Sequence, residues 1–484
     1  MGIIKRQTFQ GTTISYIGVL IGFVSAAILS PHVDSRYIGL VSVIVSYSII
    51  ISQVGSLGLA GITTRLFAYF RSDDNKHNGF LFVALMISVV GFIIAVLVII
   101  AIRYCAYKER ASDDLFIEYY WYIIPVTFFT IFFNLFDNYY KVLFNAVKGI
   151  FLKELVQKIG TFVALLMIVA GFIDFETFVF VYLFGYSLPG ILILISALQD
   201  KNNNFKPDFD FLSKNLKRSI VSVGLFSVIS GASGIVALNV DKIMIESIAN
   251  LSDVGIYTVA FYFGVIIAVP SRSMLKISSA LMSESWKNND FENIKKIYFK
   301  SAINLSIIGA LFVIGIYINL DNIIILLKGD YADGKYVIIF IALAYLSDMV
   351  SGAASQVLFT SKKYKYHSYL MILYVILIIL TNYILIPVYG INGAAVATMI
   401  SKIVINLIRF VIIFLSFEFQ PYNYKFLLLI AISALTIGVN ELVPEQINFI
   451  VDVALRSTIV SVVFLMLVYL FNLSSDLNAL YKSK

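Results

Sequence analysis

Long apolar blocks alternate with short polar connectors along the whole chain. An α-helix rises 1.5 Å per residue, so about 20 apolar residues cross a hydrocarbon core of about 30 Å. Fourteen blocks approach this length: 10–30, 38–60, 79–102, 120–143, 155–173, 177–198, 219–239, 254–275, 299–319, 336–358, 368–388, 391–415, 425–443 and 448–471. The pattern predicts an all-α polytopic membrane protein with about 14 transmembrane helices.

The composition agrees with this prediction. The 484 residues are 60% hydrophobic and 13% charged, whereas about a quarter of the residues in a soluble domain are charged. A soluble enzyme, a nucleic-acid-binding protein and a disordered scaffold are therefore excluded. The single cysteine and three dispersed histidines have no disulfide or metal-ligand spacing, and there is no Walker A loop. We expect no metal, no cofactor and no ATP hydrolysis by the chain itself.

The basic residues are distributed unevenly between the connectors. With a cytoplasmic N-terminus, 26 of the 36 Lys and Arg residues fall on the cytoplasmic side, 7 fall on the opposite side and three lie within spans. Membrane proteins carry such an excess in their cytoplasmic loops. The net charge of +7 therefore predicts orientation, with both termini cytoplasmic, and does not indicate a polyanionic partner.

The two halves of the chain resemble each other at a shift of about 212–216 residues. Lys217-Arg218 corresponds to Lys5-Arg6, for example, and residues 253–256 correspond to 37–40. Six spans per copy is an even number, so the copies share one orientation and form two parallel bundles. The predicted domains are a six-helix lobe at 1–215, a second at 216–415, and two additional helices with a short cytoplasmic tail at 416–484.

Several short segments carry a family resemblance. They are Ile4-Lys5-Arg6-Gln7, Tyr37-Ile38-Gly39-Leu40, Gly255-Ile256-Tyr257, Gly329-Asp330-Tyr331 and the hairpin Pro387-Val388-Tyr389-Gly390-Ile391-Asn392-Gly393-Ala394-Ala395. Together they resemble the polysaccharide transporter branch of the multidrug/oligosaccharidyl-lipid/polysaccharide (MOP) exporter superfamily. The resemblance covers essentially the whole chain.

This resemblance implies a function and a set of partners. A family member is expected to flip undecaprenyl-pyrophosphate-linked oligosaccharides, such as O-antigen, capsule or exopolysaccharide units, from the cytoplasmic to the periplasmic leaflet by alternating access. The resemblance also implies a V-shaped, two-lobed fold in a bacterial inner membrane. Expected partners are the lipid-linked substrate, the bilayer and glycan assembly proteins, without nucleic acid, and the functional state is expected to be a monomer. Coupling to H⁺ or Na⁺ stays open.

The predicted span 391–415 carries a polar stripe. Thr398, Lys402, Asn406 and Arg409 follow i, i+4, i+8, i+11 spacing, which places them on one helix face. Ionisable groups inside a span are costly and indicate function, and guanidinium groups pair well with phosphate oxygens. We predict that these two cations and two polar residues line a cavity for a pyrophosphate or acidic sugars. Alternatively, Arg409 snorkels to the headgroups and Lys402 pairs with a buried carboxylate.

Other cations near the cytoplasmic ends of spans are further candidates for substrate binding. Arg65 and the pair Arg272 and Lys276 hold corresponding positions on the second and eighth spans and would form a basic vestibule for the lipid diphosphate. Lys141 follows Asp137 by one helical turn, so the two can pair. Topological anchoring of the first three and a simple ion pair for the last two stay open as alternatives.

Buried acids form a last group of candidates. Asp348 within a span, Asp137, and Asp241 with Lys242 after the seventh span are predicted to act in gating or ion coupling, because a buried carboxylate can take up a proton or Na⁺. Near the C-terminus, Asp452 and Arg456 have i, i+4 spacing and are predicted to pair with each other.

Two other functions are compatible with a chain of many membrane spans. A cation-coupled multidrug exporter with the same superfamily fold is the alternative, although such exporters usually have twelve spans and acidic rather than basic cavity groups. A membrane-embedded glycan polymerase or ligase needs a sizeable outer loop, and all the outer connectors of this chain are short. The sequence therefore predicts a flippase and not an enzyme.

Overall fold

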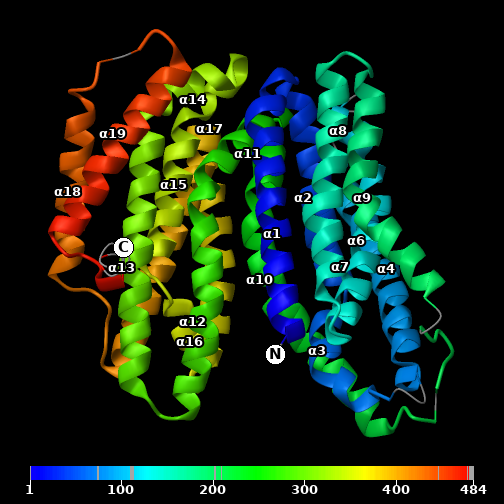
Figure 1. Ribbon diagram of the computed structural model, residues 1–484. Helices are drawn as coiled ribbons and strands as arrows, with labels where there is room; N and C mark the ends of the chain where they lie inside the picture. The colour runs from blue at the N-terminus through cyan, green and yellow to red at the C-terminus, as the bar shows by residue number, and fades with distance from the viewer. Residues whose placement is uncertain are drawn as a thin grey trace. The chain divides into compact units, whose positions relative to one another are not determined.

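The computed structural model describes residues 2–72, 76–108, 114–200, 203–208, 210–444, 446–476 and 478, and the side chains of Lys5 and Arg6 lie outside this description. The regular elements of the described chain are all helices (Figure 1). They form two compact units, Met1–Thr258 and Val259–Lys484.

The first unit is a bundle of long apolar helices joined by short helical turns. Its helices are α1 (Gly2–Val24), α2 (Ser35–Gly55), α3 (Leu59–Phe70), α4 (Phe80–Cys105), α5 (Leu115–Tyr119), α6 (Ile123–Val142), α7 (Ala146–Phe151), α8 (Gln157–Val169), α9 (Phe175–Gln199), α10 (Lys214–Ile248) and the first part of α11 (Leu251–Val265). Helix α8 packs along α9, and α2 packs on α4, α6 and α10.

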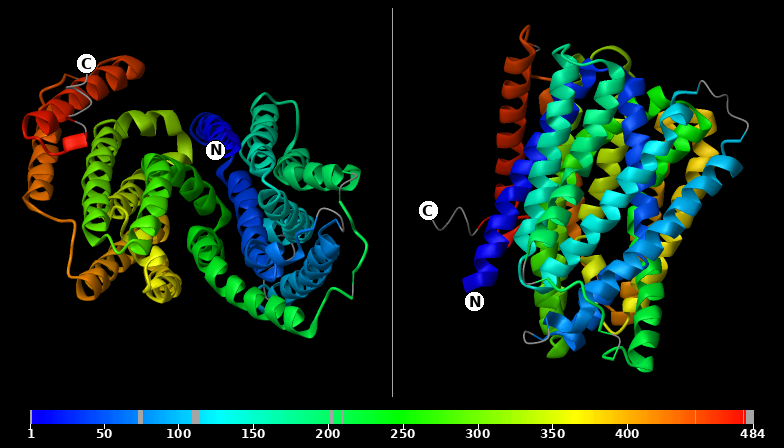
Figure 2. Two further views of the ribbon diagram at one scale, coloured as in Figure 1. Left: turned by 60° about the horizontal axis from the view of Figure 1, so that its bottom comes forward. Right: turned by 90° about the vertical axis from the view of Figure 1, so that its right-hand side faces the viewer.

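The second unit is also a helical bundle. Its helices after α11 are α12 (Val269–Lys287), α13 (Phe291–Ile318), α14 (Leu320–Leu327), α15 (Lys335–Val350), α16 (Ala354–Thr360), α17 (Tyr364–Phe417), α18 (Tyr424–Asn440) and α19 (Phe449–Leu470). Helices α15 and α17 share the most extensive packing of this unit. The last two helices lie beside α13 in both figures and close an apolar core that includes Ile307, Ile432 and Phe464 (Figures 1 and 2).

All fourteen predicted apolar blocks fall on helices, so the all-α membrane fold is confirmed. By length and composition, ten helices of the described chain can cross a membrane, or up to 11 if the bent pair Gly329–Val350 and Ala354–Thr360 is one span. Helix α17, with 54 residues, contains two predicted blocks because Gly390 (φ 55°, ψ −135°) breaks it. Helices α8 and α18 are short, with 13 and 17 residues. The number fourteen stays a prediction.

Helices α2 and α11 approach each other at two glycines that the sequence repeat aligns. A Cβ on Gly39 would lie 1.8 Å from the carbonyl oxygen of Leu251, and one on Gly255 would lie 1.9 Å from that of Ser35. The hydroxyls of Ser35 and Ser252 lie 2.6 Å apart beside this crossing. Small residues allow such backbone contact between membrane helices. The reciprocal contact therefore depends on glycine at both repeat positions.

The packing places α10 with the first unit, because α10 lies against α2 and α3. The boundary between the compact units along the chain therefore falls between residues 258 and 259. The sequence repeat predicts the start of the second lobe at residue 216. The boundaries 1–215, 216–415 and 416–484 follow the sequence repeat and stay a prediction.

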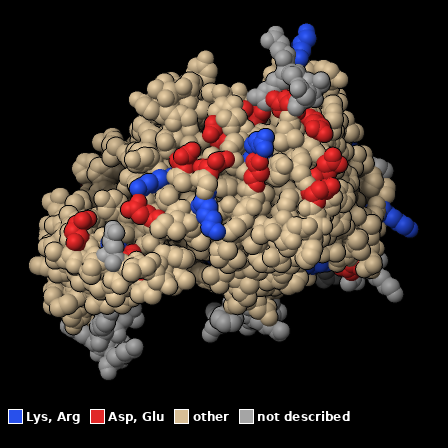
Figure 3. Space-filling view, turned by 90° about the horizontal axis from the view of Figure 1, so that it is seen from above, with Lys and Arg blue, Asp and Glu red and all other residues tan. Residues whose placement is uncertain are grey.

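Acidic side chains gather on the surface that Figure 3 shows from above, where Asp and Glu outnumber Lys and Arg. Asp34, the residue before α2, accepts a hydrogen bond of 2.8 Å from Nη2 of Arg36. This bond holds the pKa of the Asp34 carboxyl below its usual value. A chain with a net charge of +7 thus keeps little of its basic surface on this face.

Candidate functional site

The polar stripe of α17 packs against α15 in the second unit. Lys402 Nζ lies 2.5 Å from Asp348 Oδ2. Asn406 Nδ2 donates to Asp348 Oδ1 and to Ser347 Oγ, each at 2.9 Å. Arg409 Nη1 donates to Asn406 Oδ1 at 2.6 Å. We call Asp348, Lys402, Asn406 and Arg409 the α15–α17 cluster.

Aromatic rings enclose the cation at one end of this cluster. The ammonium of Lys402 lies 4.3 Å from the ring centroid of Tyr345 and 5.6 Å from that of Tyr374. Ring faces attract cations at such distances. The Lys402 side chain is only 11% exposed, whereas that of Asp348 is 40% exposed. The carboxylate is therefore the accessible member of this ion pair.

Arg409 has a different environment at the other end of the cluster. The residue is buried, with 9% of its surface exposed. Its Nε has no hydrogen-bond partner, and no carboxylate of the described chain forms an ion pair with it. The cluster therefore contains two cations and one carboxylate. Thr398, also buried, lies one turn before Lys402 on the same helix.

The polar stripe has two interpretations: a cavity lining for an anionic substrate, or an ion pair of Lys402 together with an Arg409 that extends to the headgroups. The arrangement bears on the second of these. Lys402 pairs with a carboxylate, as the alternative interpretation has it, and that carboxylate is Asp348. Arg409 is buried and donates to Asn406 of the same helix. The roles of Lys402, Arg409, Thr398 and Asn406 in substrate binding, and of Asp348 in gating, stay predictions.

The first unit contains a polar cavity of about 320 Å³. Asp137 and Lys141 of α6 both line it and form an ion pair of 2.5 Å, as their spacing predicted. The lysine side chain is 46% exposed and the aspartate 13% exposed. Their predicted functions in binding and gating stay predictions.

Helix α7 approaches this ion pair closely. A Cβ on Gly149 would lie 1.8 Å from Asp137 Oδ1. Glycine at residue 149 therefore allows the carboxylate to keep its position beside Lys141.

We expect Gly149→Ala to displace the Asp137 carboxylate and to break its contact with Lys141. The cost in unfolding free energy should be about 1–2 kcal/mol, in the usual range for a local steric change. Thermal unfolding in detergent measures this effect. Gly438→Ala is the matched control, since a Cβ at residue 438 meets nothing within 4 Å, and it should unfold like the wild type. Equal melting of both variants would contradict the assignment.

The sequence did not indicate Lys153, which also lines the cavity of the first unit. This residue precedes the predicted span 155–173, so it counted among the cytoplasmic loop lysines. The structure places it in a π-helical turn, Leu152–Val156, between α7 and α8. Such turns alter the face that a side chain presents and occur often at functional sites. A helical period of 3.6 residues cannot reveal this turn.

Asp241 belongs to a separate buried cluster of the first unit. Asp241 Oδ2 accepts a hydrogen bond of 2.7 Å from the hydroxyl of Tyr257. On the same helix, Glu246 accepts one of 2.8 Å from Tyr107, whose hydroxyl lies 2.5 Å from that of Tyr47. The apolar pattern did not indicate Glu246, because this residue lies beyond the predicted span 219–239. Gating by Asp241 and Lys242 stays a prediction.

The predicted vestibule residues lie apart from these clusters. Arg65 is exposed on α3 in the first unit. Arg272 and Lys276 are exposed on α12 in the second unit. None of the three lines the cavity of the first unit or belongs to the α15–α17 cluster. A common basic vestibule stays a prediction.

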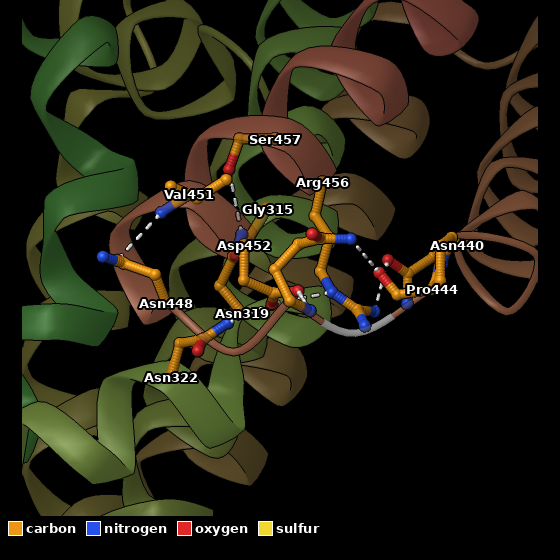
Figure 4. A network of polar contacts seen from close by, with 11 residues as sticks. Gly315, Asn319, Asn322, Asn440, Pro444, Asn448, Val451, Asp452, Arg456 and Ser457 are labelled. Atoms are coloured by element: carbon orange, nitrogen blue, oxygen red, sulfur yellow. Dashed lines mark hydrogen bonds and ion pairs between the residues drawn. The ribbon is translucent and has the colours of Figure 1, made fainter.

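The predicted pair near the C-terminus is confirmed. Arg456 Nε donates to Asp452 Oδ2 at 2.8 Å, and both residues are buried. Figure 4 shows that Asn322 and Asn440 complete this network, with Asn322 donating to Asp452 and Arg456 donating to Asn440. A buried ion pair needs such additional hydrogen bonds. The network joins α14, α18 and α19 and is best explained as a structural connection.

The fold and its long apolar helices define a multi-pass membrane protein built of helical bundles. The chain belongs to the family described as "Polysaccharide biosynthesis protein", whose pattern matches residues 4–276. Among curated proteins, no sequence matches this chain. The resemblance seen in the sequence is thereby confirmed.

Solved structures of known transporters share this fold. The lipid II flippase MurJ in an inward closed conformation superimposes with a TM-score of 0.74 at 13% identity, over 95% of this chain and 98% of MurJ. An inward-facing multidrug resistance MATE family transporter of the MOP superfamily gives 0.63 at 15% identity, over 83% and 96%. A mutant of the Vibrio cholerae MATE transporter VcmN gives 0.51 at 12% identity, over 85% and 97%.

Proposed function

We propose that this protein is a flippase that transfers undecaprenyl-pyrophosphate-linked oligosaccharides from the cytoplasmic to the periplasmic leaflet of a bacterial inner membrane. The family supports a role in polysaccharide biosynthesis, and the similar fold of a lipid II flippase supports a lipid-linked cargo. The observation that carries the proposal is the excess of cations in the α15–α17 cluster, where Arg409 is buried without a carboxylate partner.

A buried charge without a counterion is costly, and an arriving anion removes that cost. The guanidinium of Arg409 keeps its Nε–H available, and a phosphate oxygen is a suitable acceptor for such a group. The accessible Asp348 carboxylate can move away from Lys402 as the anion approaches, so that both cations face the diphosphate. An excess of cations favours this cargo over a cationic drug.

The remaining parts of the proposal concern topology and transport. The uneven distribution of Lys and Arg between the connectors supports an N-terminus on the cytoplasmic side, since basic residues are retained there. The lobes predicted at 1–215 and 216–415 would move against each other in a monomer, without enzymatic chemistry. Coupling to H⁺ or Na⁺ would use a buried carboxylate such as Asp241, which is 3% exposed.

Reconstitution into proteoliposomes tests this function. A fluorescent undecaprenyl-pyrophosphate oligosaccharide is placed in one leaflet, and its arrival in the other is followed by a membrane-impermeant quencher. We expect transfer with the wild-type protein and none in protein-free vesicles. Ethidium, a cationic dye, is the comparison cargo and should not be moved. Transport of ethidium without transfer of the lipid-linked glycan would overturn the proposal in favour of a drug exporter.

A further inference from the structure

The cavity of the first unit has a different chemistry from the α15–α17 cluster. Its lining combines side-chain amides, hydroxyls, aromatic rings and three charged groups. Phe133, Asp137, Asn138 and Lys141 lie on α6, Lys153 lies in the π-helical turn, and Gln157 lies on α8. A volume of about 320 Å³ is at the lower end for small-molecule sites.

The charged groups that line the cavity leave an excess of one positive charge. The Asp137 carboxylate forms a 2.5 Å ion pair with Lys141, and Lys153 is the second ammonium group of the lining. Its Nζ lies 6.0 Å from the ring centroid of Phe133. No carboxylate of the described chain forms an ion pair with this ammonium group. The cavity is therefore suited to a single negative charge, whereas a diphosphate needs more than one cation.

The uncharged lining is suited to a sugar ring. Gln157 Nε2 donates to the backbone oxygen of Tyr186 at 2.8 Å, which fixes this amide at the cavity wall. Asn138 is fixed in the same way, by donating to the backbone oxygen of Asn134 at 2.7 Å. Amides held in this manner present directed groups to ligand hydroxyls, and aromatic rings such as Phe133 cover the apolar face of a ligand.

We propose that the cavity of the first unit binds one acidic sugar, a pyranose with a carboxylate, and that Lys153 pairs with that carboxylate. The amides then receive the sugar hydroxyls, and the Asp137–Lys141 pair stays intact as a neutral part of the wall. This inference rests on the proposed function, since it assigns a sugar of the carried glycan to a subsite. It goes beyond that function because the subsite selects glycans by charge.

Binding of free sugars to the full-length purified protein tests the subsite directly. Isothermal titration calorimetry should show that glucuronate binds at least about 10-fold more tightly than glucose, because a charge-assisted hydrogen bond contributes about 1.5–3 kcal/mol. Lys153→Gln should reduce the affinity for glucuronate by about 10-fold and leave glucose binding unchanged. Arg36→Gln is the matched control, because Arg36 lies in an exposed pair of the first unit and does not line this cavity, and it should bind like the wild type.

Other outcomes overturn the proposal. Equal glucuronate affinity in Lys153→Gln and the wild type would remove Lys153 from the site. If inorganic phosphate displaced glucuronate and bound with the same affinity, the cavity would be a general anion site. If glucuronate did not bind at all, a site for an acidic sugar would be excluded.

A second measurement separates this inference from the proposed function and tests the lipid-linked source of the sugar. Lys153→Gln should slow flipping of a lipid-linked glycan that contains glucuronate by about 10-fold, as its binding does. It should flip a neutral lipid-linked glycan at the wild-type rate. Suppose that the wild type flips both glycans while Lys153→Gln slows both equally or slows neither. In that case the acidic-sugar subsite is contradicted and the proposed function is not. If the wild type flips neither, the proposed function fails.

Discussion

Arg409→Gln is expected to lower the initial rate of lipid-linked glycan flipping by about 10- to 100-fold, because a hydrogen bond between charged groups contributes about 1.5–3 kcal/mol. Arg409→Lys should give an intermediate rate, since it keeps the charge but loses the fork that matches phosphate oxygens. The proteoliposome quenching assay measures these rates at equal amounts of reconstituted protein.

The thermal stability of the same variants distinguishes binding from structure. Arg409 is buried, and its guanidinium has no carboxylate partner in the described chain, so its loss should leave the melting temperature unchanged or raise it. Arg36→Gln, which alters an exposed pair in the first unit, is the control and should flip at the wild-type rate. Wild-type flipping by Arg409→Gln, or a large fall in its melting temperature, would contradict a role in anion binding.

Removal of the Asp348 carboxylate should affect both stability and transport. Asp348→Ala leaves the Lys402 ammonium between two tyrosine rings without its counterion. Breaking a fully buried pair costs about 3–5 kcal/mol. Because the Asp348 side chain is 40% exposed, solvent screening reduces this cost, and we expect a loss of about 1–3 kcal/mol. Thermal unfolding in detergent measures it.

A double substitution separates the charge from the packing. Lys402→Met with Asp348→Leu removes both charges at similar volume and should recover most of the stability lost in Asp348→Ala. Flipping by the double variant should stay about 10- to 100-fold below the wild type, because one of the two cations for the diphosphate is absent. Additive stability losses would show that the two residues do not interact, and wild-type flipping would remove Lys402 from the substrate site.

The sequence predicted the features that depend on local chemistry. The length of each apolar block was enough to place it on a helix. In hydrocarbon the backbone N–H and C=O groups of a single spanning segment must form hydrogen bonds within that segment, and a helix does this. Helical spacing also placed Lys402, Asn406 and Arg409 on one face and paired Asp452 with Arg456, because neighbours three or four residues apart meet on the same helix. These relations involve one helix at a time.

The tertiary structure decided which helices bring their polar groups together. Asp348 and Lys402 lie on different helices, and only the packing of α15 against α17 joins them. Lys153 enters the cavity through a π-helical turn, and α7 reaches Asp137 where Gly149 has no side chain. Apolar patterns identify the buried face of a helix but not its partner, because lipid and neighbouring helices are equally apolar. The apolar pattern of this protein thus predicted where its helices lie and which of their faces are polar, and helix packing showed which of those polar groups meet.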